Sequence, residues 1–213
     1  MENFEINQLV QIPADQVSLE GELAVPPRAK GIVLFAHGSG SSRHSPRNQF
    51  VAQALQKAGI GTLLFDLLSM EEDAHYETRF DIDLLTLRLL EGTEWMEKHP
   101  EISDLNLAYF GASTGAAAAL RAAAKLGHRI SAVVSRGGRP DLAMEALPEV
   151  KAPTLLIVGG NDEIVIDLNR QAFEKLSSTK ELEIVPGATH LFEEPGKLET
   201  VAQLAQDWFK KYL

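Results

Sequence analysis

The sequence contains no cysteine, although it is 213 residues long. Disulfide bonds, thiolate metal sites and a cysteine nucleophile are therefore excluded. Stability has to come from an apolar core, and hydrophobic residues make up 45% of the chain, which is enough to build one. We expect one domain over residues 1–213, because no linker, internal repeat or low-complexity segment divides the sequence.

Positive charge and long apolar runs are also scarce. The 20 lysines and arginines stand against 30 aspartates and glutamates, so the formal net charge is -10. No basic run counters this charge, so nucleic-acid binding is not expected. No apolar run approaches the roughly 20 residues of a membrane helix, and Met1 to Gln8 does not resemble a signal peptide. We therefore expect a cytoplasmic protein that does not bind membranes.

The chain does contain a regular alternation of short apolar runs and longer segments of helical period. This alternation predicts an α/β protein with a mostly parallel sheet and helices on both faces. Polar–apolar alternation before the first run predicts an antiparallel N-terminal hairpin. Hairpin strands are expected at 9–12 and 17–25, further strands at 32–36, 62–65, 105–110, 130–135, 155–158 and 182–185, and helices at 45–58, 79–99, 114–126, 165–176 and 198–213.

A G-x-S-x-G pattern, Gly111 to Gly115, lies between a predicted strand and a predicted helix. This is the setting of a nucleophile elbow, a tight turn that needs small residues on either side of the serine. Ser113 is therefore the candidate nucleophile, placed at the edge where the parallel strands end. The alternative is an ordinary tight turn with an unreactive serine.

A nucleophilic serine needs a general base, and the base needs an acid that orients it. His190 follows the predicted strand 182–185 and is the candidate base; Asp162 follows the strand 155–158 and is the candidate acid. Both should lie at the same edge as Ser113. The other candidates are less well placed relative to strand ends or chain order; they are His75, His99, His128, Asp66, Glu163 and Asp167.

The tetrahedral intermediate of acyl transfer needs two N–H donors for its oxyanion. Thr114, the residue after the nucleophile, should supply one main-chain N–H. Ser39, in the segment His37-Gly38-Ser39-Gly40 after the strand 32–36, should supply the other. The same segment read as a phosphate-binding loop lacks the lysine and the glycine spacing of such loops.

Taken together and in this order, these motifs resemble the α/β-hydrolase superfamily, and within it the dienelactone hydrolase-like group. The resemblance covers nearly the whole chain and implies an α/β-hydrolase fold, with the oxyanion loop, nucleophile, acid and base at the positions named above. Dienelactone hydrolase itself uses a cysteine where this chain has Ser113. Simple ester hydrolysis is therefore the expected activity, without metal or cofactor.

Two features bear on the substrate. Fewer than twenty residues separate the strands 130–135 and 155–158, which leaves room for one short helix and only a minimal lid, so compact esters are favoured.

Arginines near the predicted edge could bind a substrate carboxylate, or pair with loop acids such as Asp141 and play no part in binding. The candidates are Arg136, Arg139 and Arg43, with Arg47 a possible addition.

The sequence thus favours a serine hydrolase that cleaves small carboxylic esters through an acyl-enzyme on Ser113. A thioesterase, an acyltransferase or a peptidase would use the same triad. A catalytically silent hydrolase fold that serves as a binding module is a third interpretation, although no triad member is missing. The expected partner is a small-molecule ester; the sequence does not specify the oligomeric state.

Overall fold

The computed structural model describes residues 4–213. Residues 1–3, which begin the segment considered above for a signal peptide, lie outside the described part. Eight strands form one sheet in the order β1-β2-β4-β3-β5-β6-β7-β8. The strands are β1 (Ile6–Ala14), β2 (Val17–Val25), β3 (Gly31–Ala36), β4 (Gly61–Phe65), β5 (Asn106–Ala112), β6 (Ile130–Arg136), β7 (Thr154–Gly159) and β8 (Lys180–Val185).

The expected N-terminal hairpin is confirmed. β1 pairs antiparallel with β2, and β2 pairs antiparallel with β4. From β4 to β8 all neighbours are parallel. The carboxyl ends of the parallel strands therefore meet at one edge, as the strand–helix alternation predicted.

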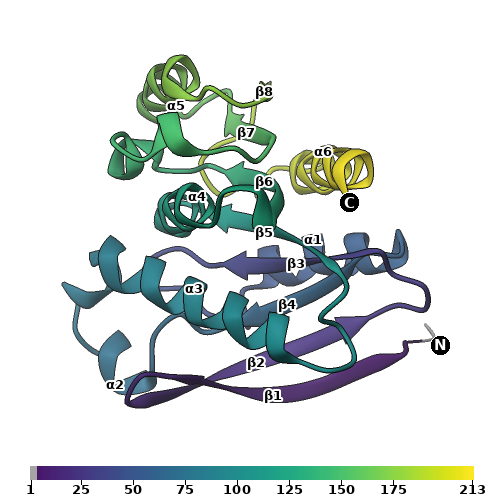
Figure 1. Ribbon diagram of the computed structural model, residues 1–213. Helices are drawn as coiled ribbons and strands as arrows, with labels where there is room; N and C mark the ends of the chain where they lie inside the picture. The colour runs from purple at the N-terminus through teal and green to yellow at the C-terminus, as the bar shows by residue number, and fades with distance from the viewer. Residues whose placement is uncertain (1–3) are drawn as a thin grey trace.

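Helices cover both faces of the sheet (Figure 1). One face packs against α1 and α6 through an apolar cluster that includes Phe35, Phe110 and Trp208. The other face packs against α3, α4 and α5 through a cluster that includes Tyr109 and Leu120. The α-helices are α1 (Pro46–Lys57), α2 (Met70–Asp73), α3 (Ile82–Lys98), α4 (Thr114–Leu126), α5 (Glu163–Lys175) and α6 (Lys197–Tyr212).

Local sequence signals explain where α1, α2 and α3 begin. Ser45 caps α1 and Pro46 occupies its first turn, and Asp81 caps α3. The short helix α2 was not predicted. Its signal is a capping box, in which Ser69 and Glu72 bond reciprocally to each other's main-chain N–H.

The segment between β6 and β7 carries no α-helix. It contains two 3-10 helices, Pro140–Ala143 and Leu147–Glu149, where one short helix was expected. The minimal lid predicted from its length is present in this form. In the described part of the chain, no helix is long and apolar enough to cross a membrane.

Candidate active site

Ser113 stands at the turn between β5 and α4, with a φ of 51° and a ψ of -120°. Non-glycine residues rarely adopt this conformation, and a residue held in such a region stores roughly 1–3 kcal/mol of strain. The surroundings enforce it: the Ser113 N–H donates to the carbonyl of Arg136 (3.2 Å), and the Ser113 carbonyl accepts from the N–H of Arg139 (3.1 Å). The turn therefore has the backbone strain of a nucleophile elbow.

The two glycines of the elbow, Gly111 and Gly115, are required because neighbouring backbone atoms lie too close to them to leave room for a Cβ. A Cβ added at Gly111 would lie 2.8 Å from the nitrogen of Ala116, and one at Gly115 would overlap the carbonyl oxygens of Ala36 and His37. Real Cβ atoms do not approach backbone atoms this closely. The glycines therefore let α4 begin directly against β3 and β5, which holds Ser113 at the sheet edge.

His190 and Asp162 are hydrogen-bonded, with 2.6 Å between His190 Nδ1 and Asp162 Oδ2. Asp162 occupies the N-cap of α5, where a carboxylate ordinarily accepts helix N–H groups, yet it makes no capping bond. Its carboxylate is directed to the imidazole instead. This is the orienting contact that a catalytic acid makes with its base.

The loops that carry this pair are fixed to each other by main-chain bonds. The N–H of Asn161 donates to the carbonyl of Ala188 (2.9 Å), and the N–H of Gly160 donates to that of Val185 (2.8 Å). At Gly159, an added Cβ would lie 2.5 Å from the carbonyl oxygen of Thr189. The loops after β7 and β8 can therefore pack closely enough to join Asp162 and His190.

His190 also approaches the Ser113 side of the site. A Cβ added at Gly137 would lie 3.5 Å from His190 Nδ1 and Cε1, and Gly137 directly follows Arg136, which accepts the Ser113 N–H. Within residues 4–213, no hydrogen bond joins Ser113 Oγ to the His190 ring. Such bonds are often long in unliganded enzymes and shorten when substrate binds.

The predicted oxyanion donors lie beside Ser113. Thr114 is the first residue of α4, so its N–H has no partner within the helix. The Ser39 N–H donates to Thr114 Oγ1 (2.9 Å), a bond that sequence reasoning missed. Ser39 as an oxyanion donor stays a prediction, and it requires this N–H to be shared with, or released from, the threonine hydroxyl.

His37 anchors the oxyanion loop, a role that sequence reasoning did not assign. Its Nδ1–H donates to the carbonyl of Gly38 (3.0 Å) and its Nε2 accepts from the N–H of Leu67 (3.0 Å). Both contacts fit one neutral tautomer. Burial lowers the pKa of His37 below its ordinary value of 6.5, although the Gly38 hydrogen bond acts in the opposite direction.

We expect this histidine to make folding stability depend on pH. Because the pKa of His37 is lower in the folded than in the unfolded chain, its contribution is complete above pH 6.5 and is lost as the pH falls towards the folded-state pKa. The slope reaches at most about 1.4 kcal/mol per pH unit. Urea unfolding between pH 7.5 and 5.5 should show a smaller slope for His37→Gln than for the parent, and an unchanged slope for His128→Gln at an exposed histidine. Equal slopes in parent and His37→Gln would contradict this role.

The predicted arginines differ in their partners. Arg43 forms ion pairs with Asp66 and Glu20, and Arg139 forms two hydrogen bonds of 2.8 Å with Asp141. For these two, acidic side chains balance the charge, which is the arrangement that the alternative interpretation described; a role of either arginine in substrate binding stays a prediction. Asp66, a competing candidate for the catalytic acid, is engaged in the Arg43 pair. Arg47 pairs with the exposed Glu193, whereas Arg136 has no acidic partner in the described part of the chain.

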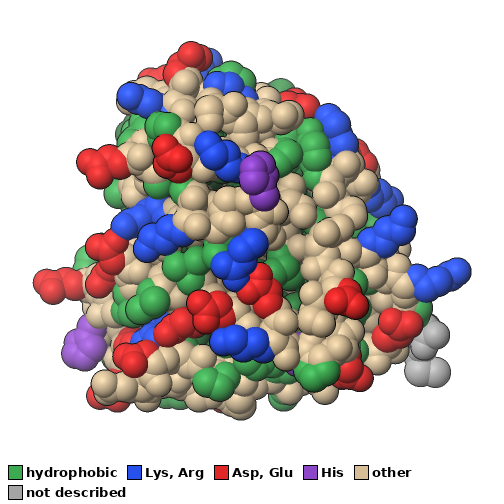
Figure 2. All heavy atoms as spheres, in the orientation of Figure 1, with side chains coloured by type: hydrophobic (Ala, Val, Ile, Leu, Met, Phe, Trp, Pro, Cys, Tyr) green, Lys and Arg blue, Asp and Glu red, His purple; other side chains and the backbone are tan. Residues whose placement is uncertain are grey.

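Figure 2 shows positive and negative side chains interspersed over the face drawn, without a large patch of one sign. An open hollow of about 420 Å3 adjoins the oxyanion loop and the start of α1. Its lining includes Ser39, Ser45 and Arg47. The space next to the oxyanion loop is therefore open and lined mainly by polar residues.

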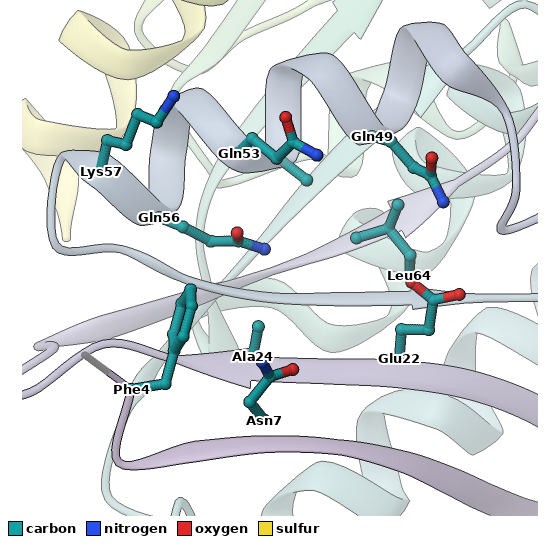
Figure 3. Close-up of a pocket in the computed structure, with 10 residues that line it drawn as sticks. Phe4, Asn7, Glu22, Ala24, Gln49, Gln53, Gln56, Lys57 and Leu64 are labelled. Atoms are coloured by element: carbon teal, nitrogen blue, oxygen red, sulfur yellow. The ribbon is translucent and has the colours of Figure 1, made fainter. Parts of the chain in front are cut away.

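A second groove, of about 300 Å3, lies between α1 and the hairpin strands (Figure 3). Gln49, Gln53 and Gln56 project into it from α1, opposite Asn7 and Phe4. Neither the elbow nor the loops of Asp162 and His190 contribute to its lining. This groove is separate from the candidate active site.

Comparison with known proteins identifies the family to which the fold and the order of the motifs point. Residues 29–208 match the alpha/beta hydrolase domain family. The chain therefore belongs to the alpha/beta hydrolase family, and the resemblance drawn from its motifs is confirmed.

Among solved structures, a dienelactone hydrolase from Anabaena variabilis is 56% identical, with a TM-score of 0.94 over 98% of each chain. Est1E from Butyrivibrio proteoclasticus shares the fold, with a TM-score of 0.79 over 96% of this chain and 98% of its own, but is only 16% identical. Two Mycobacterium tuberculosis proteins named "Putative phosphoribosyl transferase" are 56% identical over 204 residues, which is 96% of this chain and 46% of theirs. The chain thus spans about half the length of these curated relatives.

Proposed function

We propose that this protein is a serine hydrolase that cleaves small carboxylic esters through an acyl-enzyme on Ser113. The observation that carries the proposal is the strained Ser113 at a glycine-flanked elbow, at the same sheet edge as the hydrogen-bonded His190–Asp162 pair. The similarity to a solved dienelactone hydrolase along the whole chain supports the same class of reaction.

In the proposed mechanism, Ser113 Oγ attacks the ester carbonyl while His190 Nε2 takes the hydroxyl proton. Asp162 accepts from Nδ1–H and stabilises the imidazolium that forms. The oxyanion is held by the main-chain N–H of Thr114 and a donor of the oxyanion loop, near the positive end of α4. His190 returns the proton to the leaving alcohol, and water, activated by His190, then releases the acid from Ser113.

The structure around the site favours compact substrates. The segment between β6 and β7 carries only two 3-10 helices, so no long helical lid covers the elbow. An acyl chain of many carbons would leave most of its surface in water. Short esters can place the carbonyl at Ser113 without needing a deep apolar channel.

Phosphoribosyl transfer is not proposed for this chain. The named relatives are about twice as long as the matched region, and the matched region belongs to the hydrolase family. Thioester cleavage, acyl transfer and peptide cleavage by the same triad remain the alternative reactions that an assay has to compare.

A panel of p-nitrophenyl esters from acetate to laurate tests the proposal. We expect turnover of acetate and butyrate esters, with kcat/KM at least about tenfold above that for the laurate ester. A fluorophosphonate probe should label the protein stoichiometrically. A protein that is neither labelled nor active on any ester of the panel would refute the proposal and favour a silent binding module.

A further inference from the structure

Arg136, the last residue of β6, is buried, with 6% of its surface exposed. Alternation along the strand places its side chain on the α1 and α6 face, where it meets Asn48 of α1. The contact is long: Arg136 Nη2 lies 3.4 Å from Asn48 Oδ1, and Arg136 Nε has no hydrogen-bond partner. A buried guanidinium normally has a carboxylate or several carbonyls as partners.

Arg88 shows how this same protein satisfies a buried structural arginine. It is 4% exposed and bonds to Glu72 (2.8 Å), Glu91 (3.1 Å) and the carbonyl of Ala14 (3.0 Å). Two carboxylates and one main-chain oxygen balance its charge, although its Nε, like that of Arg136, has no hydrogen-bond partner among residues 4–213. Arg136 has no carboxylate partner among the described residues, and the one hydrogen bond of its guanidinium there goes to the neutral side chain of Asn48.

The surroundings of Arg136 are positive as well. Burial lowers its pKa to about 10, and the neighbouring charge of Arg47 acts in the same direction. The N-terminal end of α1, where Arg47 and Asn48 lie, adds a partial positive charge. Among residues 4–213, Arg47 forms one ion pair, with the exposed side chain of Glu193, and its Nε is buried without a hydrogen-bond partner. A negative group bound here would be attracted by the two guanidinium groups and by the N-terminal end of α1.

This cluster adjoins the reacting groups. The carbonyl of Arg136 accepts the Ser113 N–H (3.2 Å), and the next residue, Gly137, lies against the His190 ring. The Arg47–Glu193 pair links the start of α1 to the loop that carries His190. The main chain of Arg136 and Gly137 therefore contacts both Ser113 and His190.

We propose that Arg136, assisted by Arg47 and Asn48, forms an anion subsite beside Ser113, and that the substrate is an ester bearing a carboxylate or a phosphate group. The proposal rests on the function proposed above and names its substrate class. The bound anion supplies the missing counter-charge of Arg136 by a bidentate contact, for which a guanidinium is suited and an ammonium is not. In a chain of net charge -10, such a local site is needed to hold a negative substrate.

The test compares substrates that differ only in the anion: mono-p-nitrophenyl glutarate against p-nitrophenyl valerate. Arg136→Gln should lower kcat/KM for the glutarate ester about 10- to 100-fold, because a hydrogen bond to a charged group is lost. The valerate ester should change less than about twofold. Arg136→Lys should recover only part of the loss. The matched control is Arg170→Gln, which removes an exposed arginine of α5 and should affect neither ester.

Stability separates a binding role from a structural one. If Arg136 binds substrate, Arg136→Gln leaves the urea midpoint unchanged or raises it, since a buried unpaired charge is removed. A lower midpoint, with equal losses on both esters, would show a structural role and overturn the proposal. An unchanged ratio between the two esters would overturn it as well, while turnover of valerate would leave the proposed hydrolase function intact.

Binding measurements make the subsite testable without turnover. Glutarate and inorganic phosphate, each titrated by calorimetry, distinguish the two anion classes, and at least one should bind the parent protein about tenfold more tightly than Arg136→Gln. If no ester is cleaved but an anion still binds through Arg136, the hydrolase proposal fails and the subsite stands. If neither anion depends on Arg136, the subsite is refuted.

Discussion

Replacing Ser113 with alanine should lower kcat on p-nitrophenyl butyrate by about 10^5- to 10^6-fold and abolish fluorophosphonate labelling. The hydroxyl is the atom that forms the acyl bond in the proposed mechanism, so no neighbouring group can take its place. Ser103→Ala, at an exposed serine in the turn before β5, is the matched control and should retain parent activity and labelling.

A second variant separates the chemistry of Ser113 from its backbone strain. Ser113→Gly should be as inactive as Ser113→Ala, but more stable than it by roughly 1 kcal/mol, because glycine adopts a φ of 51° without a Cβ clash. Urea unfolding of both variants measures this difference. Labelling that persists in Ser113→Ala, or ester turnover within about tenfold of the parent, would refute Ser113 as the nucleophile.

Replacing Asp162 with asparagine should lower kcat by about 10^4-fold while leaving the fold intact. The asparagine amide can present its NH2 group to His190 Nδ1, which stabilises the tautomer with the proton on Nε2. That tautomer cannot accept the proton of Ser113. The prediction depends on the 2.6 Å contact between His190 Nδ1 and Asp162 Oδ2, which is the contact that the asparagine would change.

Two other aspartates provide controls for Asp162→Asn. Asp167→Asn removes an exposed carboxylate of α5 and should change kcat less than about twofold. Asp66→Asn removes a carboxylate that also follows a strand, but one that pairs with Arg43, so any loss should come through the shape of the oxyanion loop and remain far smaller than for Asp162→Asn. Equal losses at Asp66 and Asp162, or a loss at Asp162 of less than about tenfold, would contradict the assignment of the acid.

Much of the fold could be predicted from local sequence because its signals are local. Apolar runs and helical periods located all eight strands and the five longer helices to within a few residues. The short helix α2 was missed, although its capping box, Ser69 and Glu72, is visible in the sequence. A single turn of helix has too few residues for periodicity to reveal it.

The candidate site was predictable to the extent that it depends on chain order and strand ends. Parallel strands end at one edge, so a serine, an aspartate and a histidine that each follow such a strand are expected at that edge. The Asp162–His190 bond is an outcome of that rule. The bond between the Ser39 N–H and Thr114 Oγ1 was not predictable, since it joins two loops that are far apart in the sequence.

The sequence alone determined that the chain has no cysteine chemistry, that its strands and helices alternate, and that its elbow carries a serine. Tertiary structure decided which arginines have partners. Arg43, Arg139 and Arg136 look alike in the sequence, but the first two lie against carboxylates while Arg136 is buried without one. Ion pairing depends on distances between side chains from separate elements, and burial on the packing of whole helices, so neither can be read from composition or period. For this reason the candidate triad could be proposed before the fold was known, whereas the proposed anion subsite depends on the folded chain.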